Sequence, residues 1–247
     1  MPSQTDLTGT WVLETVGAQL VHAPSFANPF HLRSLNVVLV QVTQTGNTVV
    51  LDGQYCDRIQ HDDCSNPAKV IVLDSWRLTP TPLQRSGTFA PDDSGQWTLT
   101  LPSLTEVFGA TLVDPVNDAL PTDPTDLCST NPPPCLVDVD GDGYPGLSVG
   151  LQGLINGTLR SVQRQTTALV GIAVAPDRVE GGMTFASDQV LVESDPPEIK
   201  TLYAASTTYA DSMACSSTFV MVKLPADAAG AVDCAWVRAN EATLFGP

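Results

Sequence analysis

Three aspartates alternate in the stretch DVDGDGYPG at residues 138 to 146. Asp138, Asp140 and Asp142 occupy the first, third and fifth positions of the pattern D-x-D-x-D-G. Calcium in proteins takes about six to eight oxygen ligands, and a loop of this kind supplies carboxylates from these positions and a main-chain carbonyl from the seventh. That carbonyl belongs here to Tyr144. Because the three carboxylates repel one another without a cation, the spacing predicts a Ca²⁺ site.

The aspartate pattern resembles the calcium loops of EF-hands, thrombospondin type 3 repeats and dockerin modules. The resemblance implies calcium as a structural ion in a secreted protein, and it implies nothing about catalysis. The loop departs from a complete EF-hand because its twelfth position is Val149 instead of Glu. We expect the missing carboxylate to come from Asp118, Asp123 or Asp126, and Asp126 is the nearest in sequence. A solvated acidic turn and a catalytic cluster are the alternatives.

The six cysteines fall close together in pairs along the chain. The scheme that needs no assumption about tertiary contacts is local: Cys56 with Cys64, Cys128 with Cys135, and Cys215 with Cys234. Sequence alone does not choose among the connectivities. A zinc site is the alternative, but no pair has C-x-x-C spacing and the chain has three histidines. Disulfides predict an oxidising compartment, so we expect a secreted, periplasmic or cell-surface protein.

The charge balance excludes one class of partner. Eleven basic residues stand against 27 acidic ones, for a formal net charge of −16. Such a surface repels nucleic acid. No apolar run is long enough to cross a bilayer, and residues 1 to 6 lack the basic head and apolar run of a signal peptide. We therefore expect a mature exported chain that does not span a membrane, with an N-terminal tether lost by truncation as an alternative.

The elements that must position these residues are strands. The chain is 43% hydrophobic and 15% charged, and its short runs of β-branched residues between turn signals predict an all-β fold. Strands are expected at 9–16, 34–44, 47–55, 68–78, 94–102, 106–113, 146–155, 157–174, 177–194, 201–210, 217–224 and 234–239. The segments 198–215 and 225–235 are each able to hold a short helix. Gly46 fits a hairpin between two of the strands. We predict one domain over 1–247, interrupted by an Asp- and Pro-rich loop at 114–146.

About ten antiparallel strands hide their edges in a barrel or in a sandwich. Gly9-Thr10-Trp11 resembles the Gly-x-Trp opening of lipocalin-like barrels, which implies a ligand cavity inside the barrel. No nucleophile elbow, zinc-protease motif or phosphate-binding loop is present in the sequence. The expected function is a calcium-stabilised exported protein that binds an unknown ligand or protein partner, or serves in a surface assembly. A secreted hydrolase with residues from separate strands is the alternative, so enzyme activity stays open.

Overall fold

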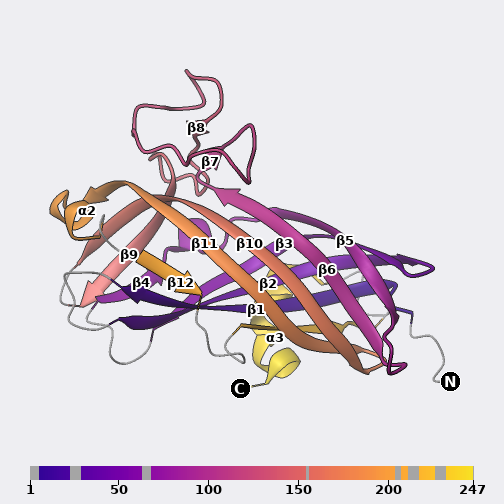
Figure 1. Cartoon of the computed structure of the whole chain (residues 1–247). Helices are drawn as coiled ribbons and strands as arrows, with labels where there is room; N and C mark the ends of the chain where they lie inside the picture. Colours follow the sequence, from indigo (N-terminus) through magenta and orange to yellow (C-terminus); the bar gives the residue numbers. More distant parts are fainter. Residues whose placement is uncertain are drawn as a thin grey trace.

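Eight strands close into an antiparallel barrel (Figure 1). The structure, a computed structural model, describes residues 6–22, 29–62, 68–153, 156–203, 207–210, 217–225 and 232–246. The ring runs through β1 (Gly9–His22), β2 (Phe30–Thr45), β3 (Thr48–Asp62), β5 (Pro82–Pro91), β6 (Trp97–Phe108), β10 (Gly157–Ala175), β11 (Arg178–Asp195) and β13 (Thr218–Lys223). It closes because β11 pairs with β10 on one side and β13 on the other, and β13 pairs with β1.

The two ends of the barrel use different strands. Near its start, β1 pairs with β13, whereas its last residues pair with β12 (Thr207–Ala210). In the same way β10 pairs with β6 along its later part and with β9 (Leu147–Gly153) along its first residues. β4 (Ala68–Val72) then extends the sheet beyond β9. The short helix α2 (Glu198–Tyr203) lies at this second end (Figure 1), where Ile199 packs against Leu151 and Leu159.

The first end of the barrel is filled by apolar side chains. Alternate residues of each strand point inward, so a period of two carries the core. Trp11, Phe89 and Phe219 are the largest fully buried side chains of this cluster. The Trp11 Nε1–H donates to the Leu7 carbonyl at 2.6 Å, which satisfies the polar atom of the buried ring. Trp11 is thus a residue of the hydrophobic core. The resemblance to lipocalin-like barrels stays a prediction.

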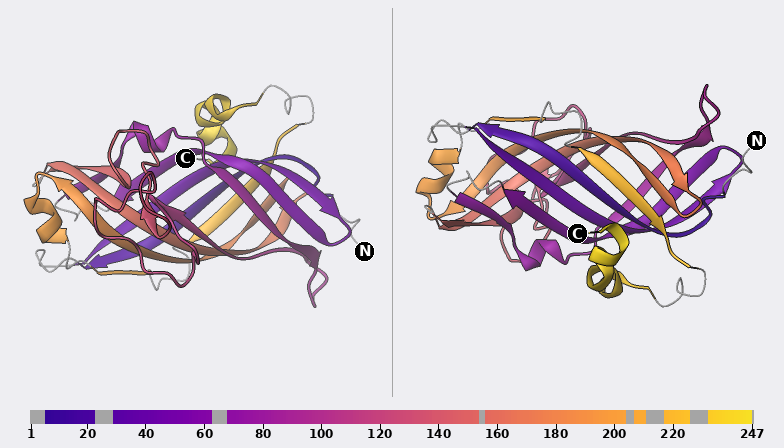
Figure 2. Two further views of the ribbon diagram at one scale, coloured as in Figure 1. Left: turned by 90° about the horizontal axis from the view of Figure 1, so that it is seen from above. Right: turned by 90° about the horizontal axis from the view of Figure 1, so that it is seen from below.

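Two further helices lie on the outside of the barrel (Figure 2). α3 (Cys234–Phe245) packs Val237 against Val12 and Val37 on the outer face of β1 and β2. α1 (Asp74–Arg77) follows β4 and contacts β3. Both helices correct the sequence prediction, because residues 74–77 and 234–239 were expected to lie in strands. Residues 234–239 are helical because the Asp233 carboxylate caps the helix, accepting from the Trp236 N–H at 2.8 Å.

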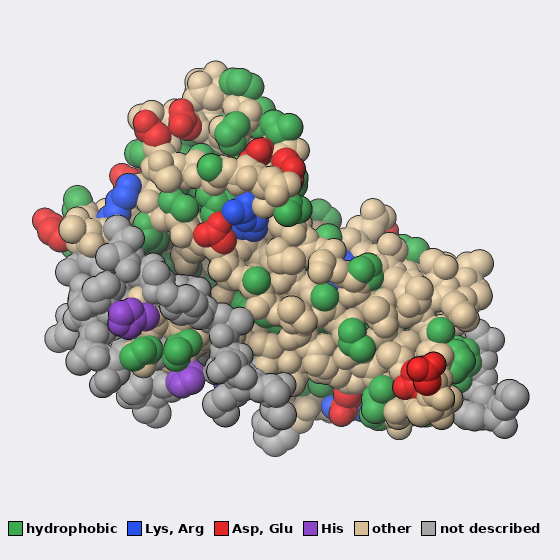
Figure 3. Space-filling model, viewed as in Figure 1, with side chains coloured by type: hydrophobic (Ala, Val, Ile, Leu, Met, Phe, Trp, Pro, Cys, Tyr) green, Lys and Arg blue, Asp and Glu red, His purple; other side chains and the backbone are tan. Residues whose placement is uncertain are grey.

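The long connection predicted at 114–146 projects from the side of the barrel (Figures 1 and 3). It contains β8 (Cys135–Leu136), which pairs with β7 (Ala110–Thr111). Figure 3 shows acidic side chains on this projection, whereas the visible flank of the barrel is mostly uncharged. Because β8 has only two residues, polar contacts hold much of the loop in place.

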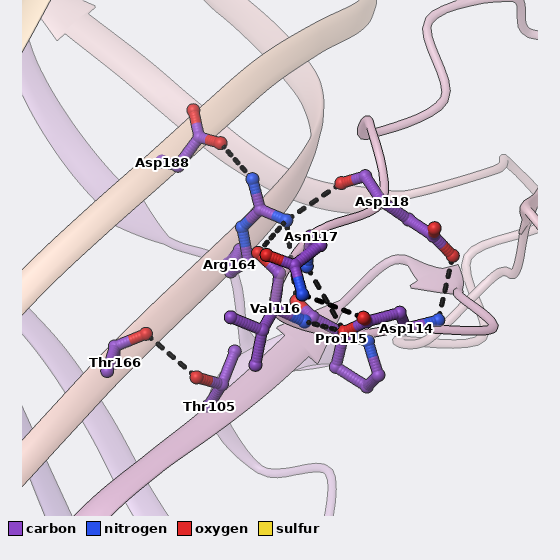
Figure 4. A network of polar contacts seen from close by, with 9 residues as sticks. All are labelled: Thr105, Asp114, Pro115, Val116, Asn117, Asp118, Arg164, Thr166 and Asp188. Carbon is purple, nitrogen blue, oxygen red and sulfur yellow. Dashed lines mark hydrogen bonds and ion pairs between the residues drawn. The ribbon is translucent and has the colours of Figure 1, made fainter.

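Arg164 of β10 anchors the start of this loop to the barrel wall (Figure 4). Its Nη1 donates to the carbonyls of Val116 and Asp118, at 3.2 and 2.8 Å, and its Nη2 pairs with the Asp188 carboxylate of β11 at 2.7 Å. The Asp118 carboxylate accepts from the N–H groups of Val113 and Asp114, which closes the turn. One exterior arginine thus joins two strands to the loop.

The disulfide prediction is correct for one pair and wrong for two. Cys128 and Cys135 are bonded, which closes the short loop. Cys56 is bonded to Cys234 instead of Cys64, so the predicted pairs Cys56–Cys64 and Cys215–Cys234 are both overturned. Cys64 and Cys215 lie outside the described residues. The local scheme fails because the barrel brings β3 beside the start of α3, 178 residues later, with a Cα–Cα distance of 4.7 Å.

The all-β prediction is confirmed, and its errors are local. Gly46 has a φ of 59° in the β2–β3 hairpin, as expected. Residues 94–102 and 106–113 were expected as two strands, but β6 runs continuously from Trp97 to Phe108. β5 was missed because its inward positions hold Arg85 and Gly87 between two apolar residues, which hides the alternation. No described helix has the length and apolar character needed to cross a membrane.

Candidate functional site

The structure brings the three alternating aspartates together. Asp138, Asp140 and Asp142 each offer a carboxylate oxygen, and these atoms lie within 4.8 Å of one another. Gly141 and Gly143 have φ values of 69° and 88°, which let the chain turn tightly around the carboxylates. The cluster is therefore suited to hold a metal ion.

Hydrogen bonds from the loop itself hold the outer two carboxylates. Asp138 accepts from the N–H groups of Gly141 and Gly143, at 2.7 and 2.9 Å. Asp142 accepts from the Tyr144 N–H at 2.9 Å and from the Ser148 hydroxyl at 2.6 Å. These donors fix the directions of the carboxylates and lessen their repulsion, so the loop is organised in advance for a cation.

Asp140 is the buried member of the cluster, with 7% of its surface exposed. Its Oδ2 accepts from the Ser75 hydroxyl and the Ser148 N–H, both at 3.2 Å. Its Oδ1 is buried without a hydrogen-bond partner among the described residues. Burial raises the pKa of Asp140, and the neighbouring carboxylate of Asp142 adds to the rise. A buried carboxylate oxygen without a donor is costly unless a cation compensates it, so this atom fits a metal ligand.

The other predicted ligands are not gathered in the same way. Asp126 is exposed in the projecting loop, its main-chain carbonyl accepts from the Leu136 N–H, and its carboxylate is outside the described cluster. The Asp123 carboxylate accepts from the main chain and hydroxyl of Thr125. Asp126 and the Tyr144 carbonyl stay predicted ligands. The Arg160 guanidinium stacks on the Tyr144 ring, with its central carbon 3.5 Å from the ring centroid. This contact ties the loop to β10.

A cavity of about 140 Å³ occupies the second end of the barrel. Its apolar wall comes from strands and from α1, and its polar wall is rich in amides and hydroxyls. The apolar members are Val21, Leu32, Ile59, Val70, Val72, Trp76, Phe108, Leu147, Val149, Leu159 and Leu191, and the polar members are Gln19, Ser34, Asn36, Gln60, Ser161, Gln163, Gln165 and Gln189. A cavity of similar size can take a benzene-sized molecule.

Arg58 is the charged side chain among the described residues that line this cavity. Its residue surface is 4% exposed, and its guanidinium carbon lies 4.0 Å from the Trp76 ring centroid and 4.3 Å from that of Tyr55. Nη1 donates to the Thr79 carbonyl at 3.1 Å. Nη2 is buried without a partner among the described residues. Burial lowers the pKa of Arg58 to about 10, so the guanidinium stays protonated at neutral pH.

A second set of buried polar side chains, those of Tyr55, Arg85 and Glu106, lies deeper in the barrel and lines a void of about 20 Å³. The Tyr55 hydroxyl donates to the Glu106 carboxylate at 2.8 Å. Burial raises the pKa of Glu106 and of Tyr55, and for Tyr55 the nearby carboxylate contributes as well. Arg85 donates to the carbonyls of Pro102 and Thr167, at 2.9 and 3.0 Å, beside the irregularity in the β6–β10 pairing. Its guanidinium therefore supports the bulge in the sheet.

The aspartate loop and the cavity share a wall. Ser75, which donates to Asp140, precedes Trp76 in α1, and Trp76 covers the Arg58 guanidinium. On the other side Ser148, which donates to both Asp140 and Asp142, lies between the cavity-lining residues Leu147 and Val149. A cation in the loop would thus stiffen two segments that line the cavity.

Comparison with known proteins identifies no relative: no protein-family model matches the chain, and no curated protein or solved structure is significantly similar to it. The fold and the geometry of the two sites therefore carry the functional argument. Sequence reasoning missed Arg58, Trp76 and Glu106. Arg58 lies just after the strand predicted at 47–55, and nothing local distinguished it from a surface residue.

Proposed function

We propose that the protein is an exported binding protein that holds a small ligand in the barrel cavity. The cavity of about 140 Å³, with its mixed amide and aliphatic lining, is the observation that supports this role. Eight-stranded barrels are wide enough to be filled by side chains or to hold one small ligand. Here one end is filled, and the other keeps a cavity with oriented polar groups, as ligand sites usually do.

The binding role is tested with a neutral probe of the cavity's size. Benzyl alcohol should show saturation transfer in ligand-observed NMR with the wild-type protein, and the Ser34→Phe variant should lose this signal because the new ring fills the cavity. Thr100→Phe, which places the same ring on the exposed outer face of β6, is the matched control and should retain the signal. Equal signals from the wild type and Ser34→Phe would contradict binding in the barrel.

We further propose that calcium occupies the aspartate loop as a structural ion. Three carboxylates within 4.8 Å, and the Asp140 Oδ1 without a partner among the described residues, support a cation, and oxygen ligands favour a hard one. Magnesium suits the loop less well, because it keeps its own waters and demands stricter octahedral geometry. The two disulfides support an oxidising, extracytoplasmic location, where such loops and bonds persist.

Thermal unfolding with calcium and with EGTA tests the ion. At a free concentration of about 100 times Kd, binding to the folded state adds about 2.7 kcal/mol. For a chain of this size the melting temperature should rise by about 5–10 °C. Asp140→Asn should abolish the rise, and Asp93→Asn, an equal change of charge in the exposed turn between β5 and β6, should retain it. Identical melting temperatures with calcium and EGTA would remove the ion from the proposal.

A hydrolase is the second candidate that the sequence leaves open, and no specific observation favours it. The described cavity lining has the hydroxyls of Ser34 and Ser161 but neither a histidine nor a pair of acids. His22 and His31 are exposed, and neither lines the cavity. The His61 side chain lies outside the described part of the chain. The arrangement therefore supports binding more directly than covalent chemistry.

A further inference from the structure

The charge inside the barrel is opposite to the charge of the chain. The chain has a formal net charge of −16, yet Arg58 is the charged side chain among the described residues of the larger cavity's lining. The adjoining void adds Arg85 and Glu106, so the two linings together hold two guanidiniums and one carboxyl group. Two guanidiniums against one carboxyl group leave the two linings with an excess of positive charge.

The surroundings of Arg58 hold its guanidinium in one orientation. Tyr55 and Trp76 stack on it, the Phe108 ring lies 5.9 Å away, and Nη1 is held by the Thr79 carbonyl. The bidentate pair of Arg77 with Asp57, at 2.6 and 2.8 Å, fastens α1 to β3 and so keeps Trp76 over the guanidinium. A fixed guanidinium whose Nη2 has no acceptor among the described residues matches the geometry of a carboxylate.

The rest of the lining fits the apolar body of an organic carboxylate. Leu32, Leu159 and Leu191 give the cavity aliphatic contacts, and the side chains of Gln60 and Gln163 belong to its polar wall. Because a buried guanidinium donor without an acceptor costs free energy, an anion that supplies the acceptor gains affinity at this place. We propose that the ligand is a small organic anion with an apolar body, whose carboxylate binds the Arg58 guanidinium. This inference rests on the proposed binding function and specifies its ligand class.

The test compares benzoate with benzamide, which has the same shape and no charge, by isothermal titration calorimetry. The wild-type protein should bind benzoate at least tenfold more tightly than benzamide, as charge-assisted hydrogen bonds in a desolvated site allow. Arg58→Met should weaken benzoate binding tenfold or more and remove the difference between the probes. Arg58→Lys should keep part of the preference for the anion, and Arg164→Met, an exterior loss of the same charge, should keep all of it.

The outcomes separate this inference from the function on which it rests. Equal affinities for benzoate and benzamide in the wild type would overturn the anion preference even if no Arg58 variant folds, and would leave the cavity as a neutral binding site. Benzoate binding that survives both Arg58→Met and Ser34→Phe would place the anion elsewhere and overturn the inference. Absence of binding by benzoate, benzamide and benzyl alcohol at millimolar concentration would overturn both proposals.

Discussion

Replacing Cys56 and Cys234 by serine should destabilise this protein more than replacing Cys128 and Cys135. In the chain-entropy model, a disulfide stabilises a protein by restricting its unfolded state, and the effect grows with the length of the closed loop. The Cys56–Cys234 bond spans 178 residues and the Cys128–Cys135 bond spans 7. These separations give about 5 kcal/mol for the long loop and about 2.4 kcal/mol for the short one.

The assay is urea unfolding of the two double-serine variants and the wild type, followed by circular dichroism under non-reducing conditions. A loss of about 5 kcal/mol should also lower the melting temperature by about 10–20 °C in a domain of this size. Peptide mapping of the wild type provides the control, because a linked peptide pair must contain both Cys56 and Cys234. Equal destabilisation by the two double variants, or a linked pair joining Cys56 to Cys64, would refute the reasoning.

Two further predictions concern buried charges. Burial raises the pKa of Glu106 above its usual value of 4.5, so the folded state binds this proton more tightly than the unfolded state does. The free energy of unfolding therefore falls as pH rises from about 4.5 through the raised pKa. Glu106→Gln should therefore gain stability relative to the wild type across that window, and urea unfolding at a series of pH values measures the difference; a constant difference would contradict the sign. Arg77→Ala leaves the 1% exposed Asp57 carboxylate without its cation and should cost about 3 kcal/mol by the same assay. Asp57→Ala/Arg77→Ala should recover part of that loss, and a double variant no more stable than Arg77→Ala would contradict the account.

The aspartate loop shows how much of a site local sequence can specify. Its residues are near neighbours in the chain, so the D-x-D-x-D-G spacing alone predicts that the three carboxylates converge. What the spacing leaves out is the burial of Asp140 and its bond to Ser75, which is 65 residues away. Those depend on α1 lying behind the loop, which is a tertiary arrangement.

The cavity shows the opposite case. Arg58 lies on β3, and the rings around it come from β3, α1 and β6, so no short stretch of sequence contains the site. An arginine within a strand is usually solvated, and only barrel closure turns this one inward. The cavity itself arises because different strands build the two ends of the barrel, a property of pairing register that side-chain periodicity does not specify.

By itself, the sequence determined the all-β class, the β2–β3 hairpin, the long acidic loop and the bond between Cys128 and Cys135, because each depends on residues near one another in the chain. The tertiary structure decided which cysteine reaches Cys56, that residues 234–239 form a helix against the barrel, and where the interior is filled or hollow. The physical reason is the distance along the chain over which the contacts act: turn chemistry and alternation act over a few residues, whereas barrel closure joins segments up to about two hundred residues apart.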